Sequence, residues 1–412
     1  MNLLIRVLII LLIVIVSDFY YYQTLKNSFF HNTKHQLILK YIIIILCICF
    51  IIFELSVYFI IGFPEDSYIK YRQLFLILDA FILIYLPKAV IAFFLIISDL
   101  IKLIIKLSKY ILRKKSKIVI PKWIYITAFI SYFVIEGIAV YGFVYGKTNL
   151  KVERVEIFSS KLPKSFDGFT IVQISDLHLG SFLNTKTIEE SVDIVNKINP
   201  DIIVFTGDLI NVSDKEIKPF INILSKLRST YGKFSILGNH DIGDYFTLKK
   251  PINQSDITRK LIIDEKEMGF IILIDSSCYI KKGSDSIGLI GVNNCGFYPF
   301  KHSGNLPKAM KNVKDTDFKV LLSHDPNHWR AEVIEKTDID VTLSGHTHAM
   351  QLAVICKLFK ISPAMFKYHE WYGLYNSGEQ QLYVNPGMSY SGFSGRIGTR
   401  PEITLITLKT KK

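Results

Sequence analysis

Apolar residues dominate the first 146 positions of this 412-residue chain, and no other feature constrains its fold as strongly. Uninterrupted apolar segments of this length are typical of membrane-spanning helices. Because lipid offers no partners for backbone amides, a segment that crosses it must satisfy its own hydrogen bonds, as a helix does. The sequence therefore predicts that residues 1–146 form an all-α bundle of about four transmembrane helices, with spans at about 3–22, 37–63, 74–97 and 123–145.

The first of these segments has a second interpretation. One basic residue, Arg6, precedes an apolar stretch of the length found in signal peptides, but no small-x-small cleavage site follows. We therefore favour an uncleaved anchor. Four charged residues also fall within the predicted spans: Glu54, Asp79, Lys88 and Glu136. Such residues usually pair inside a helix bundle, although a role in transport or headgroup binding stays open.

The basic residues of short loops indicate how such a bundle is oriented, because cytoplasmic loops are enriched in Lys and Arg. From position 102 to position 122, in the segment before the fourth predicted span, the sequence has eight basic and no acidic residues: Lys102, Lys106, Lys109, Arg113, Lys114, Lys115, Lys117 and Lys122. We therefore predict a multi-pass protein of the cytoplasmic (inner) membrane of a bacterium, with an extracytoplasmic catalytic domain. The same segment accounts for much of the net charge of +13, so no nucleic-acid partner is expected.

Residues 147–412 have the mixed composition of a globular domain, and their alternating strand and helix patterns predict an α/β fold. Five predicted strands end in clusters of Asp, His or Asn: Asp176-x-His178, Gly207-Asp208, Gly238-Asn239-His240-Asp241, Ser323-His324 and Gly345-His346-Thr347-His348. Ligands of α/β sheets bind outside the carboxyl ends of strands. A set of nitrogen and oxygen donors without cysteine favours Mn, Fe or Zn. A disulfide between Cys278 and Cys295 is left open.

In this order the five clusters resemble those of the calcineurin-like metallophosphoesterase superfamily, from about residue 169 to the carboxyl terminus. The last segments, from Tyr372 to Thr404, resemble its membrane-anchored bacterial branch, which includes phosphodiesterases and enzymes similar to UDP-2,3-diacylglucosamine pyrophosphatase. The resemblance implies a four-layer α/β/β/α sandwich that holds two divalent metal ions. By this resemblance the first metal is bound by Asp176, His178 and His348, the second by Asn239, His324 and His346, and both by Asp208.

The resemblance also implies that His240 is a catalytic group outside the metal shell, which protonates the leaving oxygen or stabilises the transition state. Many relatives carry an acid three residues after the bridging Asp to orient this histidine, but this chain has Asn211 there. We expect Asp241 to compensate as a second catalytic residue. Arg396 is predicted to bind a substrate phosphate, with a surface arginine as the alternative. His328 is interpreted as a helix-surface histidine.

The sequence therefore predicts a metal-dependent phosphoric ester hydrolase of the phosphodiesterase or pyrophosphatase type. It would cleave a phosphoester or pyrophosphate, plausibly of a phospholipid or glycolipid, by attack of a metal-bridging hydroxide. Its expected partners are the membrane and this phosphoester or lipid-phosphate substrate. The alternative is a membrane sensor or transporter accessory protein with a regulatory metal-binding domain. The complete ligand set favours the enzyme, because a protein without activity would be expected to have lost a ligand.

Overall fold

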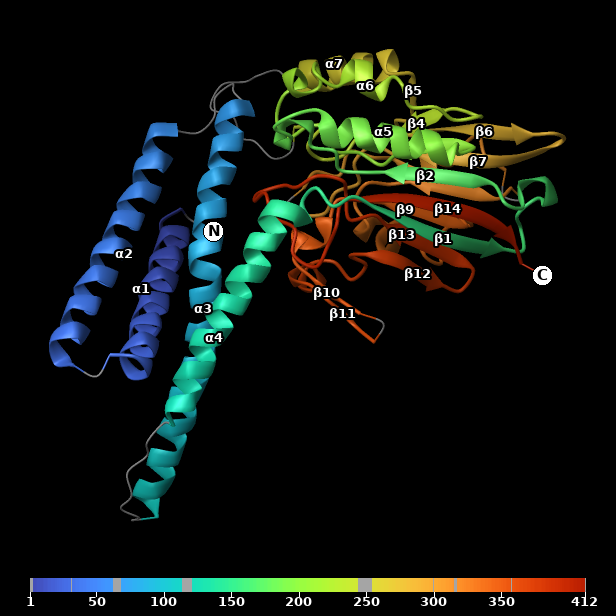
Figure 1. The fold of residues 1–412 in the computed structure, drawn as a ribbon. Coiled ribbons are helices and arrows are strands. Elements are labelled where there is room, and N and C mark those ends of the chain that lie inside the picture. The colour runs from blue at the N-terminus through green and yellow to red at the C-terminus, as the bar shows by residue number, and fades with distance from the viewer. Residues whose placement is uncertain are drawn as a thin grey trace. The chain divides into compact units, whose positions relative to one another are not determined.

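The computed structural model describes residues 3–30, 32–61, 68–112, 121–243, 254–298, 300–314, 317–356 and 358–411. The chain divides into two compact units (Figure 1). Unit 1 comprises Met1–Phe63 and Gln73–Tyr141, and unit 2 comprises Pro64–Arg72 and Gly142–Lys412. Unit 1 is helical, and unit 2 contains two mixed β-sheets with helices on their outer faces. The predicted fold class, an all-α region before an α/β domain, is confirmed.

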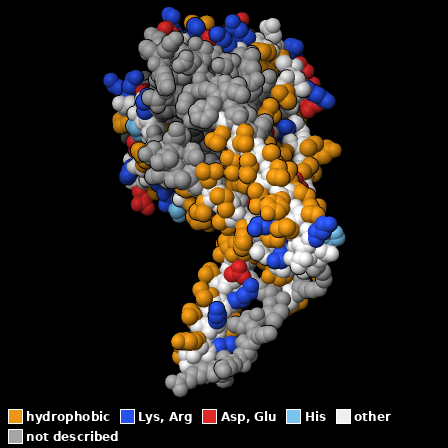
Figure 2. Space-filling view, turned by 90° about the vertical axis from the view of Figure 1, so that its left-hand side faces the viewer, with side chains coloured by type: hydrophobic (Ala, Val, Ile, Leu, Met, Phe, Trp, Pro, Cys, Tyr) orange, Lys and Arg blue, Asp and Glu red, His pale blue; other side chains and the backbone are white. Residues whose placement is uncertain are grey.

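The amino-terminal helices are α1 (Leu3–Ser28), α2 (Thr33–Ile61), α3 (Tyr68–Ile111) and α4 (Lys122–Tyr141). Hydrophobic side chains gather over them in Figure 2. Within the described residues, three segments are long and apolar enough to cross a membrane, namely Thr33–Ile52, Phe75–Ile111 and Trp123–Gly146. A soluble helix would keep such faces buried, so these exposed apolar surfaces are consistent with a lipid environment.

Helix α3 is longer than the span predicted at 74–97. Lys102, Lys106 and Lys109, expected in a loop, lie on its last turns, because lysine is a good helix former and no Gly or Pro interrupts the segment. Residues 113–117 lie outside the described residues. The predicted pairing of buried charges takes a different form: Lys88 on α3 pairs with Asp18 on α1, with 2.7 Å between Nζ and Oδ1. The side chain of Glu54 is outside the described set.

Unit 2 is built on two six-stranded sheets. The first has the order β1-β14-β2-β3-β4-β5, and the second β12-β13-β9-β8-β7-β6. The strands of the first sheet are β1 (Lys151–Ser159), β2 (Thr170–Ile174), β3 (Ile202–Phe205), β4 (Lys233–Ser235), β5 (Phe270–Ile272) and β14 (Glu402–Thr410). Those of the second are β6 (Ser276–Lys282), β7 (Asp285–Gly291), β8 (Lys319–Leu322), β9 (Val341–Ser344), β12 (Gly373–Ser377) and β13 (Gln380–Val384).

Three apolar clusters hold these sheets in four layers. The central cluster, which includes Phe169 and Val320, fills the space between the two sheets. A second cluster joins the outer face of the first sheet to α5 (Lys186–Ile198), α6 (Ile221–Leu224) and α7 (Gln254–Glu267). The third joins the other sheet to α8 (Leu306–Met310) and to a π-helical turn, η5 (Trp329–Val333). The predicted α/β/β/α sandwich is therefore present.

Parallel pairing sets the position of the site. Strands β2, β3, β4 and β5 are mutually parallel, as are β7, β8, β9 and β13. The carboxyl ends of neighbouring parallel strands meet at one edge, so the polar clusters that follow β2, β3, β4, β8 and β9 are brought together.

Shorter elements complete the unit. They are the π-helical η1 (Gly142–Gly146), the 3-10 helices η2 (Lys164–Phe166), η3 (Leu179–Ser181), η4 (Asp214–Glu216), η6 (His348–Gln351) and η7 (Pro363–Phe366), and the hairpin of β10 (Val354–Ile355) and β11 (Lys360–Ile361). The helical segments between β3 and β4 and between β8 and β9 are short turns. Cys278 and Cys295 are free thiols, so the disulfide left open by the sequence is not formed.

Candidate metal centre

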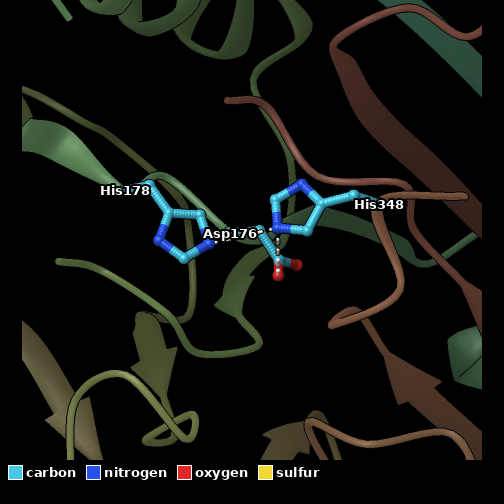
Figure 3. A group of neighbouring side chains, drawn as sticks. All are labelled: Asp176, His178 and His348. Carbon is cyan, nitrogen blue, oxygen red and sulfur yellow. Dashed lines mark hydrogen bonds and ion pairs between the residues drawn. The ribbon is translucent and has the colours of Figure 1, made fainter. Parts of the chain in front are cut away.

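The five polar clusters converge on one buried centre. Three groups place one ligand atom from each member within 4.8 Å of one another: Asp176, His178 and His348; His178, Asp208 and His240; and Asp208, His324 and His346. Figure 3 shows the first group, in which both imidazoles turn toward the carboxylate of Asp176. His348 Nε2 lies 3.3 Å from Asp176 Oδ1 and 3.1 Å from His178 Nε2. The strand ends thus supply one continuous set of nitrogen and oxygen donors.

Asp208 lies between the groups. Its Oδ2 is 3.1 Å from His324 Nε2 and 3.7 Å from His178 Nε2. Its Oδ1 accepts a hydrogen bond of 2.9 Å from the main-chain N–H of His240. Asn239 Oδ1 is 3.2 Å from His324 Nε2, and the buried amide nitrogen of Asn239 has no hydrogen-bond partner among the described residues. One carboxylate can therefore reach two adjacent ligand positions, as a bridging ligand must.

Main-chain carbonyls fix the tautomers of two of these histidines. Nδ1 of His178 is 3.1 Å from the carbonyl oxygen of Ile210, and Nδ1 of His324 is 2.7 Å from that of Thr206. A carbonyl oxygen only accepts, so each ring donates through Nδ1 and directs the lone pair of Nε2 at the centre. Metal-binding histidines are usually held in this way.

His346 is held in the opposite sense. Its Nδ1 faces His324 Nε2 at 3.2 Å, whereas its Nε2 lies 3.0 Å from the hydroxyl oxygen of Tyr368. Tyr368 was not among the residues singled out from the sequence. It is 22 positions beyond His346, in an irregular segment, and no motif connects the two.

The electrostatics of the centre suit a cation. Burial, together with the nearby His240, lowers the pKa of His178 to about 3, and burial also lowers the pKa of His346. Burial opposes ionisation of Asp208, but His324 and His240 outweigh it and hold the pKa of Asp208 well below its usual value. Burial likewise opposes charge on His324, yet Asp208 raises the pKa of His324 to about 10. Metal binding would displace that proton, since a ligand imidazole must be neutral.

The donor set fits borderline divalent cations. It combines imidazole, carboxylate and amide donors and contains no thiolate, which favours Mn, Fe or Zn over softer ions. All seven predicted ligands are buried, and His346 is the most exposed, at 9%. Several imidazole nitrogens face each other at about hydrogen-bond distance, an arrangement that a shared cation satisfies better than a single proton.

The orientation of His240 differs from expectation. Its Nδ1 is 2.8 Å from the main-chain carbonyl oxygen of Asn211, while the Asn211 side chain donates to Ser181 Oγ at 3.0 Å. The main chain of Asn211 therefore does what an acidic side chain was expected to do. The Asp241 carboxylate accepts hydrogen bonds from the main-chain N–H groups of Asp208 and Leu209, both at 2.8 Å, and from Gly238 at 2.9 Å. It holds the loop that carries Asp208.

Two other predictions fare differently. His328 is fully buried rather than at a helix surface, with Nδ1 2.8 Å from Ser323 Oγ, so that prediction was wrong. The connection after β8 turns this ring into the interior instead of presenting a regular helix face. Arg396 is only 1% exposed, which excludes the surface alternative. It donates to the carbonyl oxygens of Pro386 at 2.9 Å and Gly387 at 3.1 Å, and its Nη2 is 3.4 Å from His348 Nδ1.

Most of the predicted ligands occupy left-handed backbone conformations. The φ angles are 51° at Asp176, 40° at His178, 61° at Asp208, 71° at His346 and 49° at His348. Such angles are uncommon outside glycine and cluster at functional sites. The turns are also crowded, because a Cβ at Gly238 or Gly345 would overlap the carboxylate of Asp208 or Asp176, respectively. Sharp turns therefore aim the ligands inward.

Two family models match the chain. Residues 169–350 match the model described as calcineurin-like phosphoesterase. Residues 1–147 match the model described as probable calcineurin-like phosphoesterase, transmembrane domain. The two matches correspond to the α/β part and to the helical part of the molecule.

Relatives occur in distantly related organisms. The chain is 31% identical over 280 residues to a zebrafish (Danio rerio) transmembrane protein with metallophosphoesterase domain, covering 66% of this chain but 60% of that protein. It is 31% identical over 259 residues to the uncharacterized metallophosphoesterase YkuE of Bacillus subtilis, covering 62% and 84%. It is 27% identical over 381 residues to the uncharacterized metallophosphoesterase Cj0846 of Campylobacter jejuni, covering 92% and 93%.

Proposed function

Because this chain belongs to the calcineurin-like metallophosphoesterases, we propose that it hydrolyses a phosphoester or pyrophosphate at a centre of two divalent metal ions. It is a membrane-associated metallophosphoesterase. The observation that carries the proposal of two metals is the position of Asp208, whose Oδ2 faces ligand histidines of both groups. A single-metal site would not need one carboxylate shared in this way.

The proposed ligands follow from the groups around Asp208. The first metal is assigned to Asp176, His178 and His348, the second to Asn239, His324 and His346, and both to Asp208. The metals are drawn from Mn, Fe and Zn. We place the boundary between the membrane region and the catalytic domain after residue 146, four residues before β1 begins.

When bound, two such cations would polarise the phosphoryl oxygens and lower the pKa of a water molecule. The chain supplies the remaining roles. His240, held at Nδ1 by the carbonyl of Asn211, would in its imidazolium form present the N–H of Nε2 as the proton donor to the leaving oxygen. Asp241 accepts hydrogen bonds from the main-chain N–H groups of Asp208 and Gly238 and so fixes the two turns that carry Asp208 and His240. We therefore assign it a positioning role. Arg396 places positive charge behind His348 and holds the 386–389 turn, in preference to direct contact with a phosphate.

For the substrate, we propose a phosphoester or pyrophosphate carried by a phospholipid or glycolipid. A membrane-anchored active site has such headgroups permanently at high local concentration. We further propose that the protein is a multi-pass protein of a bacterial inner membrane, with the catalytic domain on the extracytoplasmic side. The basic residues between 102 and 122 support this orientation, because they favour the cytoplasm.

The activity is tested with purified protein and bis-p-nitrophenyl phosphate, with the corresponding monoester assayed in parallel. Hydrolysis should disappear on chelation and return with Mn, Fe or Zn. The hydrolase proposal fails if metal binds stoichiometrically but neither ester is cleaved, and that result would favour a regulatory metal domain.

The orientation is tested by labelling single cysteines in intact spheroplasts, after the native cysteines are removed. A cysteine at Ser160, just after β1, should react with a membrane-impermeant maleimide, and one at Ser116 should not. The reverse pattern would place the catalytic domain in the cytoplasm.

A further inference from the structure

The α/β unit exposes an unusual run of apolar side chains on the β10–β11 hairpin and the adjoining η7. We call this the 354–366 surface. It comprises Val354 (60% exposed), Leu358 (92%), Phe359 (49%), Ile361 (51%), Met365 (46%) and Phe366 (90%). The hairpin projects from the sheets in Figure 1. Other large exposed apolar residues of this unit, such as Phe158, Leu183 and Ile271, lie in separate elements. Contiguous apolar patches of this kind mark interaction sites.

This surface is attached closely to the metal centre. Ser362 Oγ donates to the carbonyl oxygen of Ala349 at 2.7 Å, directly after the ligand His348. Ala349, Ala364, Tyr368 and Trp371 form a small apolar cluster beneath the hairpin. Tyr368 in turn reaches His346 Nε2 at 3.0 Å. A few residues therefore connect the exposed apolar side chains to the candidate ligands.

The charged side chains in the segment that carries the surface are all basic. Between residues 349 and 369 the sequence contains lysines but no Asp or Glu. Two of these lysines, Lys360 and Lys367, are exposed. Their ammonium groups lie 5.2 Å from the ring centre of Tyr372 and 4.5 Å from that of Phe300, respectively. Exposed apolar side chains beside lysines are the pattern of elements that insert into the headgroup layer of anionic membranes.

The membrane that anchors the chain is also the partner closest to this surface along the chain. The last candidate span runs to Gly146, and β1 begins at Lys151, so only four residues separate this span from the first strand of the α/β unit. Such a short tether holds the unit at the membrane surface, where its effective concentration near lipid is very high. A soluble partner protein would need to compete with that lipid for the same apolar side chains.

We propose that the 354–366 surface inserts into the anionic headgroup layer of the membrane that anchors the chain, and that the metal centre thereby receives its substrate directly from this membrane. The second half rests on the proposed function, whereas the insertion does not. Insertion would bury Leu358 and Phe366, which otherwise face water, while Lys360 and Lys367 meet the lipid phosphates. A lipid substrate could then place its headgroup at the centre while its acyl chains stay in the bilayer.

Insertion is tested on the full chain reconstituted into vesicles of phosphatidylcholine and phosphatidylglycerol. The native cysteines are replaced, and single cysteines at Leu358 or Phe366 are labelled with an environment-sensitive fluorophore. Nitroxides on the lipid acyl chains should quench both labels, and aqueous iodide should not. The matched control is Ile263→Cys on α7, an exposed apolar position (56%) outside the surface, where iodide should quench and the nitroxides should not.

Two outcomes would overturn the insertion. One is quenching of Leu358 and Phe366 labels by iodide to the same extent as the Ile263 label. The other is fluorescence that the lipid nitroxides do not quench and that changes only when the protein is diluted within the membrane. That result would assign the surface to contact with a second copy of the chain. Raising the phosphatidylglycerol content should deepen nitroxide quenching if the lysines contribute.

Delivery of the substrate is tested with the double variant Leu358→Glu/Phe366→Glu. Its turnover of a phosphodiester lipid in vesicles should fall roughly 10²-fold, because removing each of the two apolar side chains weakens insertion by about tenfold or more. Turnover of soluble bis-p-nitrophenyl phosphate should be retained, which also shows that the variant folds. Leu183→Glu, an exposed change outside the surface, should leave both rates unaltered.

The delivery step would be overturned if the double variant lost turnover of both substrates to the same extent, or if its turnover of the lipid were unchanged. If the parent chain hydrolyses neither substrate, the proposed function fails, and the quenching experiment still decides the insertion. The two failures are therefore distinguishable.

Discussion

The histidines of the centre are held in two different ways, according to the region that carries them. At the ends of β2, β4 and β8, His178, His240 and His324 are each fixed through Nδ1 by a main-chain carbonyl oxygen. On the loop after β9, the histidines face side chains instead. His346 Nε2 faces the Tyr368 hydroxyl, and His348 Nδ1 faces the Arg396 guanidinium. A main-chain contact survives any substitution of the residue that provides it, whereas a side-chain contact does not. Substitutions should therefore alter the orientation of the histidines on this loop more easily than that of the histidines held by main-chain carbonyls.

Asp208→Asn should have the largest effect, because Asp208 faces both regions. We expect turnover to fall by roughly 10³-fold or more, since two-metal stabilisation of a phosphoryl transition state contributes several kcal/mol. Most bound metal should be lost as well, as measured by elemental analysis of the purified variant. A variant that retains two metals per chain and nearly normal turnover would show that the two regions do not share a ligand.

His240→Ala should come next, and it tests the region held by the main chain. We expect a loss of about 10²–10⁴-fold in kcat with bound metal retained, the range for removal of a general acid. The loss should be smaller for nitrophenol leaving groups than for alkyl ones, because a good leaving group needs no proton. Equal losses for both would reject proton donation by His240.

Tyr368→Phe tests the side-chain region. Removing the hydroxyl should weaken metal binding at the His346 side by about 10–100-fold, the usual cost of losing a partner of a metal ligand. Turnover should recover at high metal concentration, while one metal per chain stays tightly bound. Tyr383→Phe is the matched control, because its hydroxyl donates to Glu402 instead. Equal metal affinities for the two variants would remove the distinction between the regions.

Asn211→Ala should have the smallest effect. The carbonyl that holds His240 belongs to the main chain and remains, so the loss in kcat should stay below about tenfold, under the range for loss of a general acid. The pH profile of kcat/KM should keep the parent's shape. If the variant instead behaves like His240→Ala, the side chain of Asn211 orients the histidine after all.

The same division explains what sequence could predict. Asp176, His178 and Asp208 stand directly after strands, where short motifs reveal both their chemistry and their convergence. The contact between His240 and the carbonyl of Asn211 has no sequence signature, because every residue carries a carbonyl. The partnership of Tyr368 with His346 joins positions 22 apart through an irregular segment.

Local patterns also missed parts of the fold. Strands β10 and β11 contain two residues each, too few for an alternating pattern to appear. The interior position of Arg396 follows from the path of the 386–400 chain and not from its Gly- and Ser-rich composition. Helix α3 extends past its apolar core because lysines continue a helix as readily as they form a loop.

The left-handed backbone at Asp176, His178 and His348 has an evolutionary consequence. Each of these residues occupies a conformation that costs a non-glycine residue about 1–2 kcal/mol and that glycine adopts freely. Selection for chemistry must therefore act continuously against selection for stability at these positions. In a lineage that lost the reaction, glycine would be the favoured replacement there, and its appearance at these turns would mark the loss of activity before the fold itself changed.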